Sequence, residues 1–204
     1  DLHVLHRQPL LEILLGLVLG TLLGSAAALT MILSPLLKRW LLPVLVISQA
    51  IPVFALAPIL VLWLGYGMAS KVAMAVLIIF FPVTASLYDG MRRTDHDLLD
   101  LARIMGASPA GVLRHIVLPS ALPAFAAGLR VAAAVAPIGA VIGEWVGSSE
   151  GLGFYMLHAN ARMQVDLMFA ALTLLAAASL TLYFCIDRLL DRLVFWQPKH
   201  GTMP

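Results

Sequence analysis

Five long apolar stretches, separated by shorter polar segments, dominate the pattern of hydrophobic and polar residues along this chain. They run approximately from Leu10 to Leu33, Leu41 to Leu64, Ser70 to Tyr88, Ala121 to Ile142 and Leu167 to Leu189. A helix needs about 20 mainly apolar residues to cross the hydrocarbon core of a bilayer, and each stretch is close to that length. The sequence does not alternate as the strands of a membrane barrel do. It predicts an all-α fold, a single polytopic transmembrane helical domain over residues 1–204.

Composition agrees with a membrane protein. The chain is 61% hydrophobic and only 12% charged, whereas a soluble domain has about 25% charged residues. The basic residues lie at the ends of apolar runs and are not gathered on one face, so nucleic acid is not a predicted partner and the lipid bilayer is. The single cysteine, Cys185, cannot form an internal disulfide.

Lysine and arginine are divided unequally between the two sets of polar segments. One set holds ten of them: Lys38, Arg39, Arg92, Arg93, Arg103, Arg114, Arg130, Arg188, Arg192 and Lys199. The opposite set holds three: Arg7, Lys71 and Arg162. The positive-inside bias predicts that the first set, and with it the carboxyl terminus, is cytoplasmic. Five spans then place the amino terminus outside, and Asp1 is not a natural initiator, so we expect an amino-terminal span to be missing from this sequence.

The segment from Asp95 to Pro119 is the longest polar interruption. Its apolar residues recur at helical spacing and form one stripe, made by Leu98, Leu99, Leu101, Ala102 and Met105. Asp95 is positioned to cap a first helix, Gly106 to end it in a left-handed conformation, and Ser108 to cap a second helix that Pro109 begins and that ends near Leu118. Such a loop suits docking into a groove on a soluble partner. A solvated or interfacial helix is the alternative.

Two spans carry polar or helix-breaking residues that favour a translocation path. Pro43, Pro52 and Pro58 interrupt the second stretch, with Ser48 and Gln49 between them. An internal proline frees a backbone carbonyl that a neighbour or water must satisfy. A broken helix with an uncharged amide fits the wall of a path, and a kink that only improves packing is the other interpretation.

Glu144 follows the fourth apolar stretch directly, with no basic residue within ten positions. An ionisable residue at membrane depth indicates function, so we expect Ser48, Gln49, Pro52 and Glu144 to line the path. Alternatively, Glu144 braces the external segment near Arg162.

Other polar or small residues in the apolar stretches have less specific interpretations. Glu12 is expected to be an interfacial acid, with a cavity-facing acid as the alternative. The Gly16, Gly20, Gly24 stripe is expected to serve helix packing or a hinge. The segment from Gly147 to Asp166 is too polar to span and is expected to form a short external or re-entrant helix. The charges at the end of the fifth stretch, Asp187, Arg188, Asp191 and Arg192, are expected to be solvated.

Several catalytic and nucleotide-binding motifs are absent from the sequence. It has no Gly-x-x-x-x-Gly-Lys-Ser/Thr phosphate loop and no Gly-Lys pair. It also lacks a Ser/His pair with a glycine elbow, a His-Glu-x-x-His motif and any metal-ligand cluster. No enzymatic activity, cofactor or metal is therefore predicted, and ATP, if used, must be bound by another subunit.

The polar interruption also has the spacing of a family signature. Asp100-Leu101-Ala102, three residues, Gly106, nine residues, Ile116, one residue, Leu118-Pro119 resembles the E-A-A, G, I-x-L-P loop of ABC importer permeases. Asp100 and Leu101 depart from that motif. Further resemblance lies in Ser48-Gln49-Ala50-Ile51-Pro52, Ala57-Pro58, Trp63-Leu64-Gly65, and Gly143-Glu144 followed by Gly151-Leu152-Gly153.

From about Leu10 to Trp196 the chain resembles type I binding-protein-dependent importer permeases of the aliphatic sulfonate, taurine, nitrate and thiamine-precursor branch. The resemblance implies an inner-membrane permease dimer, two cytoplasmic ABC ATPases and a periplasmic binding protein. It also implies that the loop from residue 95 to 118 couples to the ATPase through Asp100, Leu101, Ala102, Arg103, Gly106, Ala107, Ser108, Ile116, Leu118 and Pro119.

The substrate that this resemblance implies depends on two further segments. The run from Arg130 to Gly147 and the run from Leu157 to Arg162 are most similar to hydroxymethylpyrimidine permeases. A thiamine-precursor pyrimidine is therefore the expected substrate, with a sulfonate, taurine or nitrate as alternatives. From another class, a secondary transporter or an intramembrane enzyme stays an alternative, although the inverted repeat expected of the former is not visible.

Overall fold

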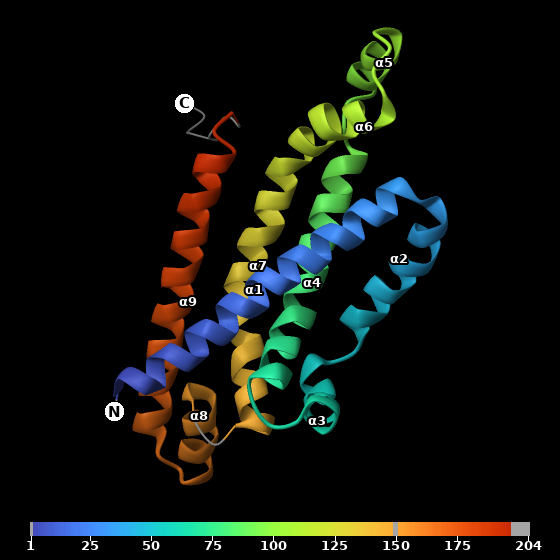
Figure 1. Cartoon of the computed structure of the whole chain (residues 1–204). Coiled ribbons are helices and arrows are strands. Elements are labelled where there is room, and N and C mark those ends of the chain that lie inside the picture. Colours follow the sequence, from blue (N-terminus) through green and yellow to red (C-terminus); the bar gives the residue numbers. More distant parts are fainter. Residues whose placement is uncertain (1, 149–150, 197–204) are drawn as a thin grey trace.

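The computed structural model describes residues 2–148 and 151–196, and within these ranges the chain is helical, without a strand (Figure 1). The α-helices are α1 (Leu2–Leu33), α2 (Pro35–Ala50), α3 (Val53–Leu64), α4 (Met68–Arg92), α5 (His96–Ile104), α6 (Pro109–Val112), α7 (Leu118–Gly147), α8 (Leu152–Ala161) and α9 (Val165–Leu193). A π-helical segment, Leu113–Val117, joins α6 to α7. This confirms the predicted all-α fold.

Four helical segments are long and apolar enough to cross a membrane: Leu11–Leu33, Met68–Arg92, Pro109–Val146 and Val165–Leu193. Together, α2 and α3 meet the same test, although the chain bends by 106° between them. Counting that pair as one broken span, the described residues contain the five predicted spans. Most of these helices extend beyond the predicted limits, although α1 ends at Leu33 and α3 at Leu64 as predicted. Polar residues such as Arg92 and Glu144 continue the last turns of α4 and α7.

The core is built on α4, which packs against α7 on one side and α1 on the other (Figure 1). The glycine stripe of α1 faces α4. A Cβ atom added to Gly16 would lie 2.4 Å from the Cβ of Ala75, and one added to Gly20 would lie 2.7 Å from Cγ2 of Ile79. Real side chains cannot approach so closely, so only glycine permits this helix spacing. The packing interpretation of the stripe is confirmed.

The second span breaks at one proline rather than three. Pro43 lies inside α2 and Pro58 inside α3, whereas the chain leaves helical geometry at Ile51 and Pro52. A proline disfavours the helical region for the residue before it, and Ile51 is extended at φ −85° and ψ 121°. The break therefore follows from Pro52. The prediction that Pro43 and Pro58 also interrupt the helix is wrong.

The two ends of the bundle differ, and we name them by their elements. Helices α5 and α6 project beyond the other helices at one end, the loop end, whereas α8 and the α3–α4 turn lie at the other, the α8 end (Figure 1). The short helix expected between Gly147 and Asp166 is α8. Of the residues used to predict orientation, Lys199 lies outside the described residues.

One prediction about charges near the last span is wrong: Arg130, predicted in a polar segment, lies inside α7. Asp187 and Asp191, expected to be solvated, are half-exposed and exposed, and both also bind Arg130. Arg130 Nε donates to Asp187 and Arg130 Nη2 donates to Asp191 over 2.8 Å. These ion pairs join α7 to α9. Partner residues 57 and 61 positions away in sequence cannot be recognised from local spacing.

Candidate functional site

Local hydrogen bonds shape the loop between α4 and α7 as its sequence predicts. The Asp95 carboxylate accepts a hydrogen bond from the Asp97 N–H over 2.9 Å and caps α5. The Ser108 hydroxyl accepts one from the Gly111 N–H over 3.2 Å and caps α6, which Pro109 begins. At the base of the loop, the hydroxyls of Thr94 and Ser120 lie 2.9 Å apart and link the end of α4 to the start of α7.

Gly106 ends α5 in a Schellman arrangement. Its φ is +75°, its N–H donates to the Arg103 carbonyl, and the Ala107 N–H donates to the Ala102 carbonyl, each over 3.0 Å. Only glycine adopts this left-handed conformation without steric cost. A Cβ atom added to Gly106 would meet nothing within 4 Å. Backbone conformation, and not packing, is therefore what requires glycine here.

Most apolar side chains of α5 are uncovered. Ile104 and Met105 are 84% and 77% exposed, and Leu98 and Leu101 are about half exposed, whereas Ala102 is buried. Leu98, Leu101 and Met105 of the predicted apolar stripe are therefore uncovered, whereas Ala102 is buried and Leu99 is half-buried. An uncovered apolar helix face at a polar loop is typical of a surface that docks in a partner's groove.

The other signature residues support this surface. Arg103 and Asp100 form an exposed ion pair over 3.0 Å, which contributes little to stability. Ala107 and Ser108 are exposed, and Ile116, Leu118 and Pro119 are half-buried. The expected end of the second helix near Leu118 is wrong, because the π-helical segment Leu113–Val117 continues directly into α7.

The residues expected to line a path lie on different parts of the bundle. Gln49 and Pro52 are exposed at the break between α2 and α3, and Ser48 is half-buried. The Ser48 hydroxyl donates to the Leu45 carbonyl over 2.7 Å, so its own helix satisfies it. The side-chain amide of Gln49, in contrast, lies on an uncovered face of α2.

Glu144 is buried at the α8 end, within α7 rather than after it. Its Oε2 accepts a hydrogen bond from the Gly153 N–H over 2.6 Å, at the start of α8. Gly151 packs directly on the carboxylate: an added Cβ would lie 2.3 Å from Glu144 Cδ. These contacts support the bracing alternative, through glycine backbone rather than Arg162. The role of Glu144 in a path stays a prediction.

Near Glu144 lies a buried ion pair that the sequence did not indicate. Lys71 Nζ lies 2.9 Å from Glu12 Oε1, with side chains 8% and 3% exposed. Glu12 lies within a turn of the start of the Leu11–Leu33 segment, as expected, but is buried against Lys71. Lys71 is not in a polar segment but in α4. Gly143 gives Lys71 room, since an added Cβ would lie 3.0 Å from the Lys71 Cα. We call Glu12, Lys71 and Glu144 the buried charge cluster.

Among the residues that the structure describes, no group of three His, Cys, Asp or Glu side chains is placed to hold a metal ion. The docking surface on α5 and the buried charge cluster therefore mark the two ends of the bundle, and neither has the arrangement of a catalytic centre. Both are joined by α4 and α7, which run between them (Figure 1).

Known proteins resemble this chain over nearly its whole length. A probable ABC transporter permease of Haemophilus influenzae is 64% identical over 191 residues, which cover 93% of this chain and 78% of that protein. A formylaminopyrimidine transport permease of Halalkalibacterium halodurans is 40% identical over 200 residues, covering 98% and 80%. A riboflavin transport permease of Chloroflexus aurantiacus is 41% identical over 161 residues, covering 79% and 60%.

A solved structure shares the fold. An inward-facing structure of the MetNI methionine ABC transporter matches with a TM-score of 0.72 and 21% identity, covering 92% of this chain and 91% of that chain. The family model for the inner membrane component of binding-protein-dependent transport systems matches residues 17–196. Relatives of this kind are transport subunits and not enzymes, which decides against the intramembrane enzyme and the secondary transporter. This chain belongs to the family of binding-protein-dependent transport system inner membrane components, and is a permease subunit of an ABC importer.

Proposed function

We propose that this permease converts ATP hydrolysis on a separate subunit into opening and closing of a path, with α5 as the element that contacts the ATPase. The uncovered apolar face of α5 is the observation that carries the proposal. It projects beyond the bundle at the loop end (Figure 1). Burying such a face in a partner's groove removes apolar surface from water, which favours association.

The loop is built to transmit movement. Thr94 and Ser120 close its base, while α4 and α7 pack along their length, so a displacement of α5 moves both helices together. In the proposed complex, two copies of the permease enclose the path, two cytoplasmic ATPases bind the loop ends, and a periplasmic binding protein delivers the substrate. The path is proposed to include Ser48, Gln49 and Pro52.

Replacement of Gly106 by valine tests the coupling role. Left-handed backbone costs a non-glycine residue about 1–2 kcal/mol, so the end of α5 is expected to rearrange. In vesicles containing the complete transporter, uptake should fall severalfold more than ATP hydrolysis does. Ala177→Val is the matched control, because Ala177 is exposed and helical and lies in α9, outside the loop. Equal uptake by the Gly106→Val and Ala177→Val variants would refute the coupling role.

Cysteine labelling tests the proposed orientation. In a Cys185→Ala background, a Ser108→Cys variant should react with a membrane-impermeant maleimide only when the cytoplasmic side is open to the reagent. Ser108 is exposed on the loop, so accessibility does not limit the reaction. Labelling of Ser108→Cys in intact cells from outside would place the loop on the other face of the membrane and would refute the proposed orientation.

We propose a thiamine-precursor pyrimidine as the substrate. Support comes from the 40% identity to a formylaminopyrimidine permease and from the 41% identity to a riboflavin permease, since both cargoes are nitrogen heterocycles. An exposed amide at Gln49 suits hydrogen bonding to such a ring. Aliphatic sulfonates, taurine and nitrate are the alternatives. Calorimetry of the partner binding protein with hydroxymethylpyrimidine and with taurine distinguishes them, and tighter binding of taurine would overturn the assignment.

A further inference from the structure

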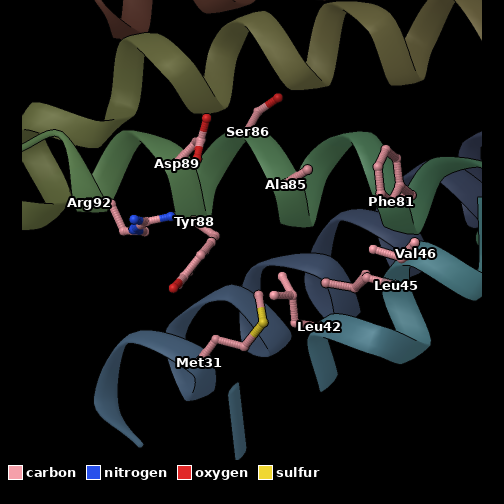
Figure 2. Close-up of a pocket in the computed structure, with 10 residues that line it drawn as sticks. All are labelled: Met31, Leu42, Leu45, Val46, Phe81, Ala85, Ser86, Tyr88, Asp89 and Arg92. Carbon is pink, nitrogen blue, oxygen red and sulfur yellow. The ribbon is translucent and has the colours of Figure 1, made fainter. Parts of the chain in front are cut away.

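A mainly apolar groove of about 370 Å³ opens at the loop end between α1, α2 and α4 (Figure 2). Met31 of α1, Leu42 and Val46 of α2, and Phe81 and Ala85 of α4 line it. Leu42 and Val46 are 43% and 62% exposed, so the groove lies on the outside of the bundle. Its volume falls within the range of small-ligand sites.

Two cations lie near the ring of Tyr88, which lines the groove together with Arg92. Lys38 Nζ lies 5.6 Å and the Arg92 guanidinium carbon 5.7 Å from the centre of the Tyr88 ring, and Tyr88 itself is buried. Both distances are within the range of cation–π contacts. Within residues 2–148 and 151–196, neither Lys38 nor Arg92 forms an ion pair with a carboxylate.

Asp89 also lines this groove but does not neutralise Lys38 and Arg92. Its carboxylate binds Arg93 over 3.1 Å. Figure 2 shows the Asp89 side chain on the side of α4 away from α1 and α2, whereas Tyr88 and Arg92 lie on the side that faces them. The groove therefore has apolar walls and a positively charged mouth.

We propose that this groove binds an anionic phospholipid, with its phosphate between Lys38 and Arg92 and an acyl chain along Met31, Leu42 and Phe81. A guanidinium and an ammonium are the groups that best bind phosphate oxygens. Basic pockets between helices on the cytoplasmic side of a membrane attract anionic headgroups. The assignment of the lipid to the cytoplasmic leaflet rests on the proposed cytoplasmic position of the loop end, whereas the site itself does not.

A lipid fits the groove better than its two rivals. Free phosphate would satisfy the cations but leave the apolar walls unfilled. A second copy of the chain would have to bring a carboxylate to the paired cations as well as apolar side chains to the walls. An anionic lipid supplies both chemistries in one molecule, and the bilayer presents it at high local concentration.

Native mass spectrometry of the full-length chain tests the proposal. The purified protein is delipidated in detergent and incubated with equal amounts of phosphatidylglycerol and phosphatidylcholine. The wild-type chain should retain phosphatidylglycerol preferentially. In Lys38→Gln/Arg92→Gln that preference should fall by about tenfold or more, because each basic residue contributes about fivefold to affinity for an anionic surface.

Two further variants separate charge at the groove from charge elsewhere and from shape. Arg39→Gln/Arg188→Gln removes two exposed charges that do not line the groove and should retain the wild-type preference. Ala85→Leu fills the groove without altering charge and should also lower retention.

Competing anions and the association of copies identify the occupant. Glycerol phosphate at the same concentration as the lipid should not displace it. Displacement by glycerol phosphate would indicate a free phosphate site instead, and loss of the bound lipid whenever two copies associate would indicate a protein interface. Equal lipid retention by the Lys38→Gln/Arg92→Gln and wild-type chains would also overturn the proposal. Neither an ATPase nor a substrate is needed, so failure here is distinct from failure of the coupling role.

Discussion

At the α8 end, Lys71 places a positive charge in the interior of the bundle, and Glu12 stabilises it over 2.9 Å. Removing one partner of a buried pair leaves an uncompensated charge and costs about 3–5 kcal/mol. Lys71→Met should therefore lower the midpoint of thermal unfolding in detergent, and Glu12→Gln/Lys71→Met should recover most of the loss. Arg103→Met, at the exposed pair, should change it little. Equal effects of the two single variants would contradict this account.

Glu144 gives a separate prediction, because its carboxylate accepts the hydrogen bond of the Gly153 N–H. Glu144→Ala leaves that buried donor unsatisfied, at a cost of about 1–3 kcal/mol. Glu144→Gln keeps an oxygen acceptor and should lose less. Thermal unfolding measures both variants, and uptake assays separate bracing from a path role. If bracing is its role, Glu144→Gln should transport normally; loss of uptake by a stable Glu144→Gln chain would favour the path.

The conformations of the loop residues could be predicted from the sequence, whereas the pairing of Lys71 with Glu12 could not, because the two sets differ in how far apart their partners lie along the chain. Asp95, Gly106 and Ser108 act on backbone groups within five positions, and all three conformations were predictable from local chemistry. Lys71 and Glu12 are 59 positions apart. No local pattern in the sequence indicates that pairing, so Glu12 and Lys71 are not predicted to meet.

Between elements, Arg130 forms a polar link that joins α7 to α9. Its guanidinium binds Asp187 and Asp191 on successive turns of α9, and α9 otherwise buries few residues, among them Ala171 and Leu190. Arg130→Gln should loosen α9. In a Cys185→Ala background, a disulfide between Ala126→Cys and Leu190→Cys, which belong to one apolar cluster, should then form more slowly. Arg188→Gln should leave its rate unchanged, and an unchanged rate in Arg130→Gln would argue against the link.

The positions of the spanning helices could be predicted from the sequence, whereas the bends and connections between them could be predicted only in part. The spans could be predicted because only a long run of apolar residues, folded as a helix, is stable in the hydrocarbon core of a bilayer. The 106° bend needed more: three prolines were equivalent in sequence, yet only Pro52 follows a residue that leaves the helix. Pro43 and Pro58 remain within α2 and α3, which continue through them. The π-helical connection into α7 likewise has no distinct sequence pattern.

For the whole molecule, one chain leaves much of its helix surface uncovered. The α9 helix is largely exposed, and Gln49 lies on an exposed face of α2. An amide facing hydrocarbon is costly, so another protein surface or water must meet Gln49. We expect two copies related by a two-fold axis, because one surface then faces its own counterpart and encloses a path. Native mass measurement of the complex should give two permease chains for two ATPase chains. In a Cys185→Ala background, Gln49→Cys should form an intermolecular disulfide near the axis, whereas one permease chain per two ATPases would refute the assembly.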